Sequence, residues 1–211
     1  MADIAINARV ECTDGSCGRS TYVIINPVNH KVTHFVLQDK HLPDNPTRLV
    51  PAENVAGATQ EQIELNCAKA DVAKMAPFVV SNFIRESAPG QAYASGQAYT
   101  SQYVVDDTAY DEVQERNIPE GLWAVYSGMH VEASDGHVGK VDGLVVDPNR
   151  GEVTYLLMWE GHLWGKREVT IPVSAAYFCD ADTVYLKLDT AAVEALPVGP
   201  VKGYPSRQRI V

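Results

Sequence analysis

Short runs of alternating hydrophobic and polar residues follow one another along most of the chain, and turn residues separate them. A first set of runs comprises ARVECT, GRSTYVIIN, KVTHFVLQ, RLVP and QIELNC. A second set follows as MHVEAS, GKVDGLVVD, EVTYLLMWE, EVTIP and TVYLKL. Alternation with a period of two, in runs rich in Val, Ile and Thr, is typical of half-buried strands. The pattern predicts an all-β protein with two groups of short strands.

The two groups are copies of one unit, displaced by 121 positions along the chain. Val10 and Gly18 fall on Val131 and Gly139 at this displacement, and the match continues without a gap. Further matched pairs are Asp14 and Asp135, Pro27 and Pro148, His41 and His162, Pro51 and Pro172, and Leu65 and Leu186. Two copies are too few for a solenoid, so we expect each copy to enclose its own small core.

The repeat divides the chain into a first domain at residues 1–78, an acidic linker at 79–128, a second domain at 129–197 and a basic tail at 198–211. Five short strands predict a small barrel in each domain. The last strand of each copy runs into a helical pattern that is suited to close one end of a barrel. The expected fold is therefore two small β-barrels in tandem, each with a short C-terminal helix, joined by an extended linker.

Each copy contains an Asp followed by two glycines, in DGSCG and DGHVG. Asp14 and Asp135, each with a glycine after it, lie between the first two strands, where a tight hairpin favours such a pair. Gly18 and Gly139 lie at the start of the second strand, where a missing side chain permits a bulge. A dinucleotide-binding loop requires a helix after the glycines, and an EF-hand requires further acidic ligands. The motif therefore indicates hairpin turns.

The sequence resembles the PRC-barrel family in its DG-x-x-G turn, its NP or DP hairpin, its V-T-[HY] strand and its [VI]-P segment after a loop. The phrases CGRSTYVIINP, EGHLWGKREVTIPVSA and DTVYLKLD are similar to bacterial proteins with two tandem PRC-barrel domains. The resemblance covers residues 8–77 and 129–197. It implies a binding or assembly module without catalytic residues, as in the reaction-centre H subunit and a ribosome maturation factor. Neither the transmembrane helix of the former nor the RNA-processing domain of the latter is recognisable.

Composition and charge narrow the expected partners. The 211 residues are 45% hydrophobic and carry a formal net charge of −10, as an ordinary soluble globular chain does. Neither copy has the excess of Lys and Arg that a nucleic-acid surface requires. No apolar run approaches the ~18 residues of a membrane span, and no signal peptide is recognisable. We expect a cytoplasmic protein with no nucleic-acid partner and no membrane insertion.

The four cysteines all have apolar counterparts in the other copy. Cys12, Cys17, Cys67 and Cys179 fall on Ala133, Val138, Leu188 and Ala58, respectively. Buried free thiols are the simplest account, because free cysteine packs as a small hydrophobic residue. A disulfide between Cys12 and Cys17, which flank a turn, is the alternative. No Cys or His pair has the spacing of a zinc site, so no metal and no other cofactor is expected.

No nucleophile elbow, Walker loop or HExxH motif occurs, so we expect no catalytic residues and a protein that is not an enzyme. The expected function is a protein-interaction or assembly adaptor that binds a protein partner or forms a homo-oligomer. Two alternatives stay open. One is an RNA-processing or ribosome-assembly accessory factor, and the other is a small redox or metal-binding protein.

The linker supplies a first group of candidate binding residues. The sequence GQAY occurs twice there, and the segment contains Tyr93, Tyr99 and Tyr103. A segment that only has to be soluble does not need so many tyrosines. Tyrosine is enriched at the energetically important positions of protein interfaces. The alternative is a tether that lies over the protein's own domains.

The second copy supplies the other group, Trp159, His162 and Trp164 in the segment WEGHLWG, where the first copy has QDKHLPD. Exposed aromatic residues of this kind form contact patches. The alternatives are that the histidine fixes its loop and that the tryptophans pack between the two domains.

Overall fold

The computed structural model describes residues 2–4, 6–39, 46–59, 61–85, 110–147, 149–160 and 167–197. The described residues are mostly in β-strands, which confirms the all-β class. They belong to two units, one of Met1–Phe78 with Ile118–Val211 and the other of Val79–Asn117. None of the helices in these ranges has the length and apolar character that crossing a bilayer requires.

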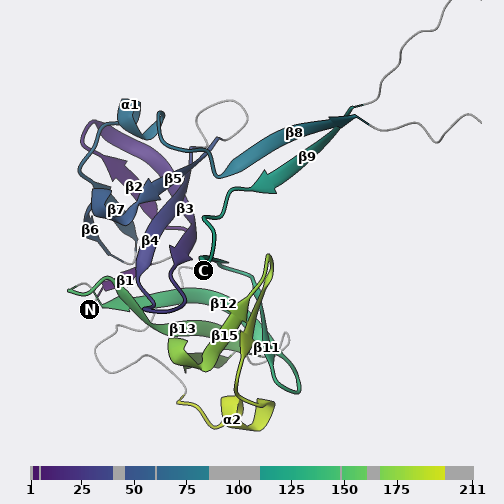
Figure 1. The fold of residues 1–211 in the computed structure, drawn as a ribbon. Coiled ribbons are helices and arrows are strands. Elements are labelled where there is room, and N and C mark those ends of the chain that lie inside the picture. The colour runs from purple at the N-terminus through teal and green to yellow at the C-terminus, as the bar shows by residue number, and fades with distance from the viewer. Residues whose placement is uncertain are drawn as a thin grey trace, which may run out of the picture. The chain divides into compact units, whose positions relative to one another are not determined.

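The first repeat forms a sheet in the order β5-β4-β3-β2-β7-β6 (Figure 1). Its strands are β2 (Arg9–Cys12), β3 (Gly15–Ile25), β4 (Val32–Gln38), β5 (Thr47–Pro51), β6 (Val55–Ala58) and β7 (Gln62–Leu65). The pairs are antiparallel except for β2 with β7, which is parallel. A 3-10 turn, η1 (Ala52–Asn54), precedes β6, and the short helix α1 (Lys69–Val72) follows β7.

The second repeat reproduces this topology in the order β14-β13-β12-β11-β16-β15. Its elements are β11 (His130–Ala133), β12 (Gly136–Asp147), β13 (Glu152–Glu160), β14 (Arg167–Pro172), η2 (Val173–Ala175), β15 (Ala176–Cys179), β16 (Thr183–Leu186) and α2 (Thr190–Glu194). The two short C-terminal helices confirm the helical pattern after each last strand. Within the described ranges no hydrogen-bonded pair joins the end strands of either path, so barrel closure stays a prediction.

Each repeat completes the sheet of the other with a short arm strand. β1 (Ala2–Ile4) precedes the first repeat and pairs with β12, while β10 (Trp123–Tyr126) precedes the second repeat and pairs with β3. Ala2 lies opposite Val146 and Trp123 lies opposite Ile25, which is the same pairing displaced by 121 positions. The equivalent residues Lys31 and Glu152 also pair with each other in an isolated bridge. The exchange of arms is therefore reciprocal.

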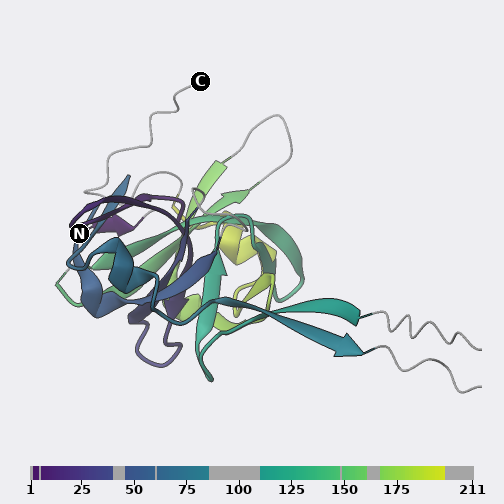
Figure 2. The same cartoon turned by 90° about the horizontal axis from the view of Figure 1, so that it is seen from above.

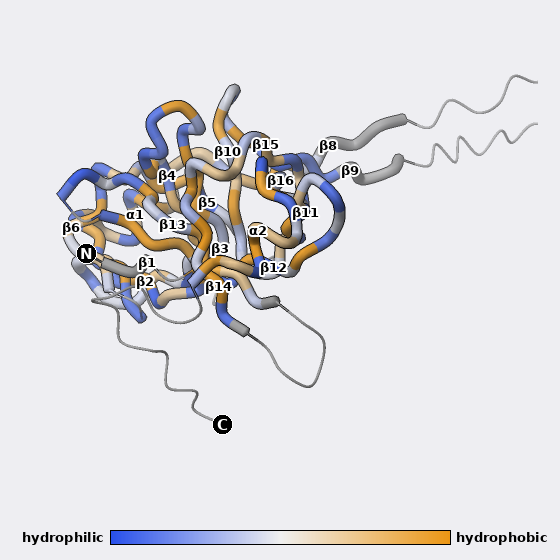
Figure 3. Tube along the Cα trace, turned by 90° about the horizontal axis from the view of Figure 1, so that it is seen from below, coloured by the Kyte–Doolittle hydropathy of each residue, from blue (hydrophilic) through white to orange (hydrophobic). Residues whose placement is uncertain are grey.

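The two repeats share one hydrophobic core. A single cluster of buried side chains contains Val23 of the first repeat, Val125 of the arm strand β10, and Leu144 and Val184 of the second repeat. Apolar stretches run along the strands and hydrophilic stretches lie at many of the turns (Figure 3). The expectation that each copy encloses its own core is wrong, because the exchanged arms bury apolar residues of one repeat against the other.

The segment predicted as a linker contains strands that its composition did not reveal. β8 (Val79–Arg85) and β9 (Tyr110–Arg116) form an antiparallel two-stranded ribbon, with Val79 opposite Arg116 and Arg85 opposite Tyr110 (Figures 1 and 2). β10 also falls within residues 79–128, although it belongs to the sheet of the first repeat. The predicted extended linker is therefore partly a β-ribbon and partly an arm of the core.

Candidate functional site

The β15–β16 hairpin exposes a group of aromatic side chains on the second repeat. Tyr177 is 56% exposed and Phe178 is 50% exposed, which makes them two of the three most exposed large hydrophobic residues in the described ranges. Both rings contact Tyr185 of β16, with centroid separations of 6.4 Å from Tyr177 and 5.6 Å from Phe178. A β-bulge between Ala176 and Phe178 sets two residues of β15 against one of β16. Two successive side chains of β15 thereby reach the same tyrosine.

Asp180 fixes the turn between β15 and β16 and holds Tyr185 in place. Its Oδ1 accepts hydrogen bonds from the backbone N–H groups of Asp182 at 3.0 Å and Thr183 at 2.8 Å, and the Tyr185 hydroxyl donates to its Oδ2 at 3.0 Å. The bond from the Asp182 N–H is the main cause that lowers the pKa of Asp180, and the bond to Asp180 raises the pKa of Tyr185. At neutral pH the pair is therefore a carboxylate and a protonated phenol.

The tip of the hairpin is also anchored to the arm strand β10. The Tyr126 hydroxyl donates to Asp182 Oδ1 at 2.8 Å. The Tyr126 ring lies 4.9 Å from that of Tyr22, which in turn lies 4.8 Å from the ring of the fully buried Phe78. A row of aromatic rings therefore links the acidic turn to the core of the first repeat. We call Tyr177, Phe178, Asp180, Asp182 and Tyr185 the β15–β16 patch.

The first repeat has no such patch at the equivalent positions. There, Tyr177, Phe178, Asp180, Asp182 and Tyr185 are matched by Ala56, Gly57, Thr59, Glu61 and Glu64. The buried neighbours keep their character, since Val184 and Leu186 are matched by the buried Ile63 and Leu65. The hairpin itself is present in both repeats, with a bulge at the same place. The aromatic residues are therefore not required by the fold of the hairpin.

Of the six binding residues predicted from sequence, the structure describes Trp159 alone. It lies on β13 between Lys140 of β12 and Glu168 of β14 and is half-buried. His162, Trp164, Tyr93, Tyr99 and Tyr103 lie outside the described residues. The sequence interpretation did not single out Tyr177, Phe178 or Tyr185. Comparing the two copies at exposed strand positions would have found them, because aromatic residues there replace Ala, Gly and Glu.

The cysteines divide into one disulfide and two free thiols. Cys12 and Cys17 are both buried and are joined by a disulfide across the first turn, as the alternative interpretation had it. Cys67 and Cys179 are free and half-buried. Burial, with a contribution from the charge of Asp180, raises the pKa of Cys179 to about 12. This thiol is therefore not a thiolate nucleophile at neutral pH.

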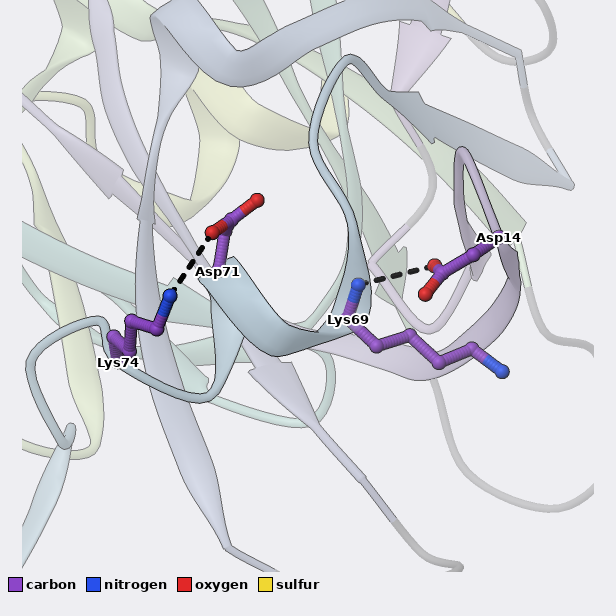
Figure 4. A network of polar contacts seen from close by, with 4 residues as sticks. All are labelled: Asp14, Lys69, Asp71 and Lys74. Atoms are coloured by element: carbon purple, nitrogen blue, oxygen red, sulfur yellow. Dashed lines mark hydrogen bonds and ion pairs between the residues drawn. The ribbon is translucent and has the colours of Figure 1, made fainter.

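The Asp of each DG turn also binds the start of the short helix of its repeat. Asp14 Oδ1 accepts a hydrogen bond from the backbone N–H of Lys69 at 3.0 Å, at the start of α1 (Figure 4). In the second repeat Asp135 Oδ1 accepts from both the N–H of Thr190, at 2.8 Å, and its hydroxyl, at 2.7 Å. These carboxylates satisfy N–H groups at helix N-termini. Among the described residues no group of three His, Cys, Asp or Glu side chains is placed to hold a metal ion.

A small cavity lies in the shared core, where Ile25 of β3 and Trp123 of β10 meet apolar side chains of the second repeat such as Leu144 and Ile171. Its volume of about 20 Å³ is close to that of one water molecule, which would find no polar partner there. The cavity is a packing defect rather than a ligand site.

No protein-family model matches this chain, and no curated protein shows a significant sequence match to it. The resemblance to PRC-barrels therefore rests on the motifs alone.

Proposed function

We propose that this chain is a non-enzymatic adaptor, built from two PRC-barrel-like repeats, that binds a protein partner through the β15–β16 patch. The observation that carries the proposal is the pair of adjacent exposed rings, Tyr177 and Phe178, on a hairpin whose copy carries Ala56 and Gly57. Aromatic residues supply much of the binding energy at protein interfaces. The first repeat forms the same bulged hairpin without them, so the hairpin does not need two exposed rings to form.

The patch is also well ordered before any partner arrives. Tyr185 is held by Asp180, and Asp182 is held by Tyr126 of the arm strand. Binding loses less conformational entropy when the contacting side chains are already fixed. The first repeat, which lacks the patch, supplies the sheet against which β10 is paired. Within the adaptor the second repeat binds and the first repeat supports it, in a cytoplasmic setting and without nucleic acid.

The residues predicted from sequence extend this proposal rather than replace it. Trp159, His162 and Trp164 are proposed as a second contact of the second repeat, and Tyr93, Tyr99 and Tyr103 as contacts of the segment between the repeats. Each set can be tested separately from the patch, because each lies in a different stretch of the sequence.

The test is gentle co-purification of the tagged full chain from its native host, followed by reconstitution with the purified partner. The main variant is Tyr177→Ala/Phe178→Gly, which installs the residues of the first repeat on the same bulged hairpin. Val28→Ser is the matched control, because Val28 is 88% exposed but lies in the turn between β3 and β4. A Trp159→Ala/Trp164→Ala variant tests the second contact.

The expected result is a stoichiometric protein partner that the control retains and the Tyr177→Ala/Phe178→Gly variant loses, although both variants stay folded. The Tyr177→Ala/Phe178→Gly variant should unfold at a slightly lower denaturant concentration, because it loses the ring contacts with Tyr185. A partner retained by both variants would place the binding surface elsewhere. Recovery of ribosomal particles by every version, in a salt-sensitive manner, would favour the ribosome-assembly alternative.

A further inference from the structure

We infer that the β15–β16 patch recognises an arginine-bearing segment of its protein partner. This inference rests on the proposed function and adds the chemistry of the partner. The two features that select arginine are ring faces open to solvent and carboxylates at their edge. An aromatic face attracts a cation through its quadrupole, and arginine is the cation most often found in such contacts.

Two of the three rings of the patch are open to solvent. Tyr177 and Phe178 are both at least half exposed, and their contacts with Tyr185 are tilted, with interplanar angles of 51° and 35°. A planar guanidinium can stack on an exposed ring of this kind while its N–H groups point outward along the ring plane. The N–H groups that extend beyond the ring can then donate charge-assisted hydrogen bonds to neighbouring carboxylates, which a purely apolar partner cannot do.

Those carboxylates surround the rings on the turn and on the neighbouring strand. Asp180 and Asp182 lie at the hairpin tip, and Glu132 of β11 lies opposite Tyr185, where its charge acts on the phenol. The hydrogen bonds that lower the pKa of Asp180 keep it ionised at neutral pH.

Two basic side chains also lie near the patch. His137 lies 3.4 Å from Glu132, and Lys187 donates to the Ser174 carbonyl oxygen at 3.1 Å. The chain as a whole carries a net charge of −10. The charge of the patch and of the chain therefore favours a basic partner.

Arginine fits this arrangement better than lysine. Its guanidinium stacks on a ring and donates to a carboxylate at the same time, whereas an ammonium group is a compact charge with strong hydration. The contact therefore depends on both the rings and Asp180, and each dependence can be measured.

The test uses the folded full chain and three soluble peptides, SRSGSRSGSR and the versions with Lys or Glu in place of every Arg. Binding is followed by the aromatic NMR signals of Tyr177, Phe178 and Tyr185 at low salt. The variants are Tyr177→Ala/Phe178→Gly, Asp180→Asn, which keeps an oxygen for the turn, and Val28→Ser as control.

The wild type is expected to bind the arginine peptide about tenfold more tightly than the Tyr177→Ala/Phe178→Gly variant does. Asp180→Asn is expected to weaken binding several-fold, the lysine peptide to bind more weakly, and the glutamate peptide not to bind. Equal affinity for the arginine and lysine peptides, or no effect of removing the rings, would overturn the inference.

The two proposals can fail separately. A partner that is captured through the patch but whose binding does not depend on arginine would leave the adaptor function intact and remove this inference. Ring-dependent binding of the arginine peptide with no captured partner would support the recognition chemistry and count against the adaptor function. Dimerisation that depends on Tyr177 and Phe178 would identify a second copy as the occupant and would also overturn the inference.

Discussion

The two repeats of this chain have the same internal framework and different surfaces. The turn carboxylates Asp14 and Asp135 both accept a hydrogen bond from the N-terminus of the following helix. The hairpins differ in their exposed side chains, since Phe178 is matched by Gly57 and Tyr185 by Glu64. The comparison separates side chains that serve the shared framework from exposed side chains that only one copy carries, and the latter are the candidates for binding.

The repeats also differ in how they are stabilised. A disulfide closes the first turn of the first repeat, whereas the buried Ala133 and Val138 occupy the same places in the second. His34 of the first repeat is matched by Tyr155 of the second. Variants that place a residue of one repeat at the matched position of the other can therefore show which residues the shared fold requires and which serve one repeat only.

The largest expected effect comes from a glycine that both repeats require. A Cβ at Gly18 would lie 2.2 Å from the carbonyl oxygen of Gln38, and one at Gly139 would lie 2.3 Å from that of Trp159. Because backbone atoms have to move, we expect Gly139→Ala to lower the free energy of unfolding by about 3 kcal/mol, as severe overpacking does. Gly18→Ala is expected to cost more, because Gly18 also has a φ of +135°. Urea unfolding measures both losses.

Gly128→Ala is the control for backbone conformation alone. Gly128 has a φ of +101°, but a Cβ there would meet no atom within 4 Å. The expected loss is about 1–2 kcal/mol, from the left-handed conformation. If Gly139→Ala lowers the free energy of unfolding no more than Gly128→Ala does, the close approach of β12 and β13 is not the reason for a glycine at position 139.

The disulfide gives the next largest effect and tests whether the first repeat needs it. Cys12→Ala/Cys17→Val installs the residues of the second repeat at the same turn. Loop closure over so short a turn predicts a loss of about 2 kcal/mol, with the fold retained. Equilibrium unfolding of the variant, compared with the reduced wild type, measures the loss. A variant that fails to fold would show that the turn of the first repeat depends on the covalent bond, unlike its copy.

The sequence predicted the parts of the structure that depend on local chemistry. The Asp-Gly turns, the strand class and the helical ends could be predicted because turn residues and alternation mark them within a few positions. The reciprocal pairing of β1 with β12 and of β10 with β3 joins strands that lie far apart in the sequence, and no local pattern encodes it. Trp159 was predicted within a strand and lies on β13. The patch around Phe178 was missed because the signals for turns and strands do not mark exposed aromatic residues.

A smaller effect separates the two helix-capping carboxylates. Asp14 accepts only the N–H of Lys69, whereas Asp135 accepts both the N–H and the hydroxyl of Thr190. Loss of a helix cap typically costs about 1 kcal/mol, which is the value expected for Asp14→Ala. Asp135→Ala is expected to lower stability more than Asp14→Ala does, and Thr190→Val should remove the difference. Equal losses in chemical unfolding would show that the second bond contributes nothing.

The protonation of Asp135 checks the same comparison without a mutation. Its bonds to Thr190, first from the hydroxyl and then from the backbone, lower the pKa of Asp135 below 3.8. The folded state therefore favours the carboxylate, so its contribution is present above pH 3.8 and is lost as the pH falls through the lowered pKa. The acid-induced loss of stability should be smaller in Asp135→Ala.

The smallest expected effect is a pH dependence near neutrality that arises from His34 of the first repeat. Burial lowers the pKa of His34 below 6.5, and the charge of Glu53 only partly opposes this. The folded state thus favours neutral histidine while the unfolded chain binds a proton near pH 6.5, so stability is complete above pH 6.5 and falls as the pH drops towards the lowered value. His34→Tyr installs the residue of the second repeat and should make the free energy of unfolding less dependent on pH between pH 7.5 and 5. Glu53→Gln should make the free energy of unfolding fall more steeply over this interval, because it removes the charge that favours protonation in the folded state. A wild-type stability that rises on acidification in this interval would reverse the sign and show that His34 is stabilised as a cation.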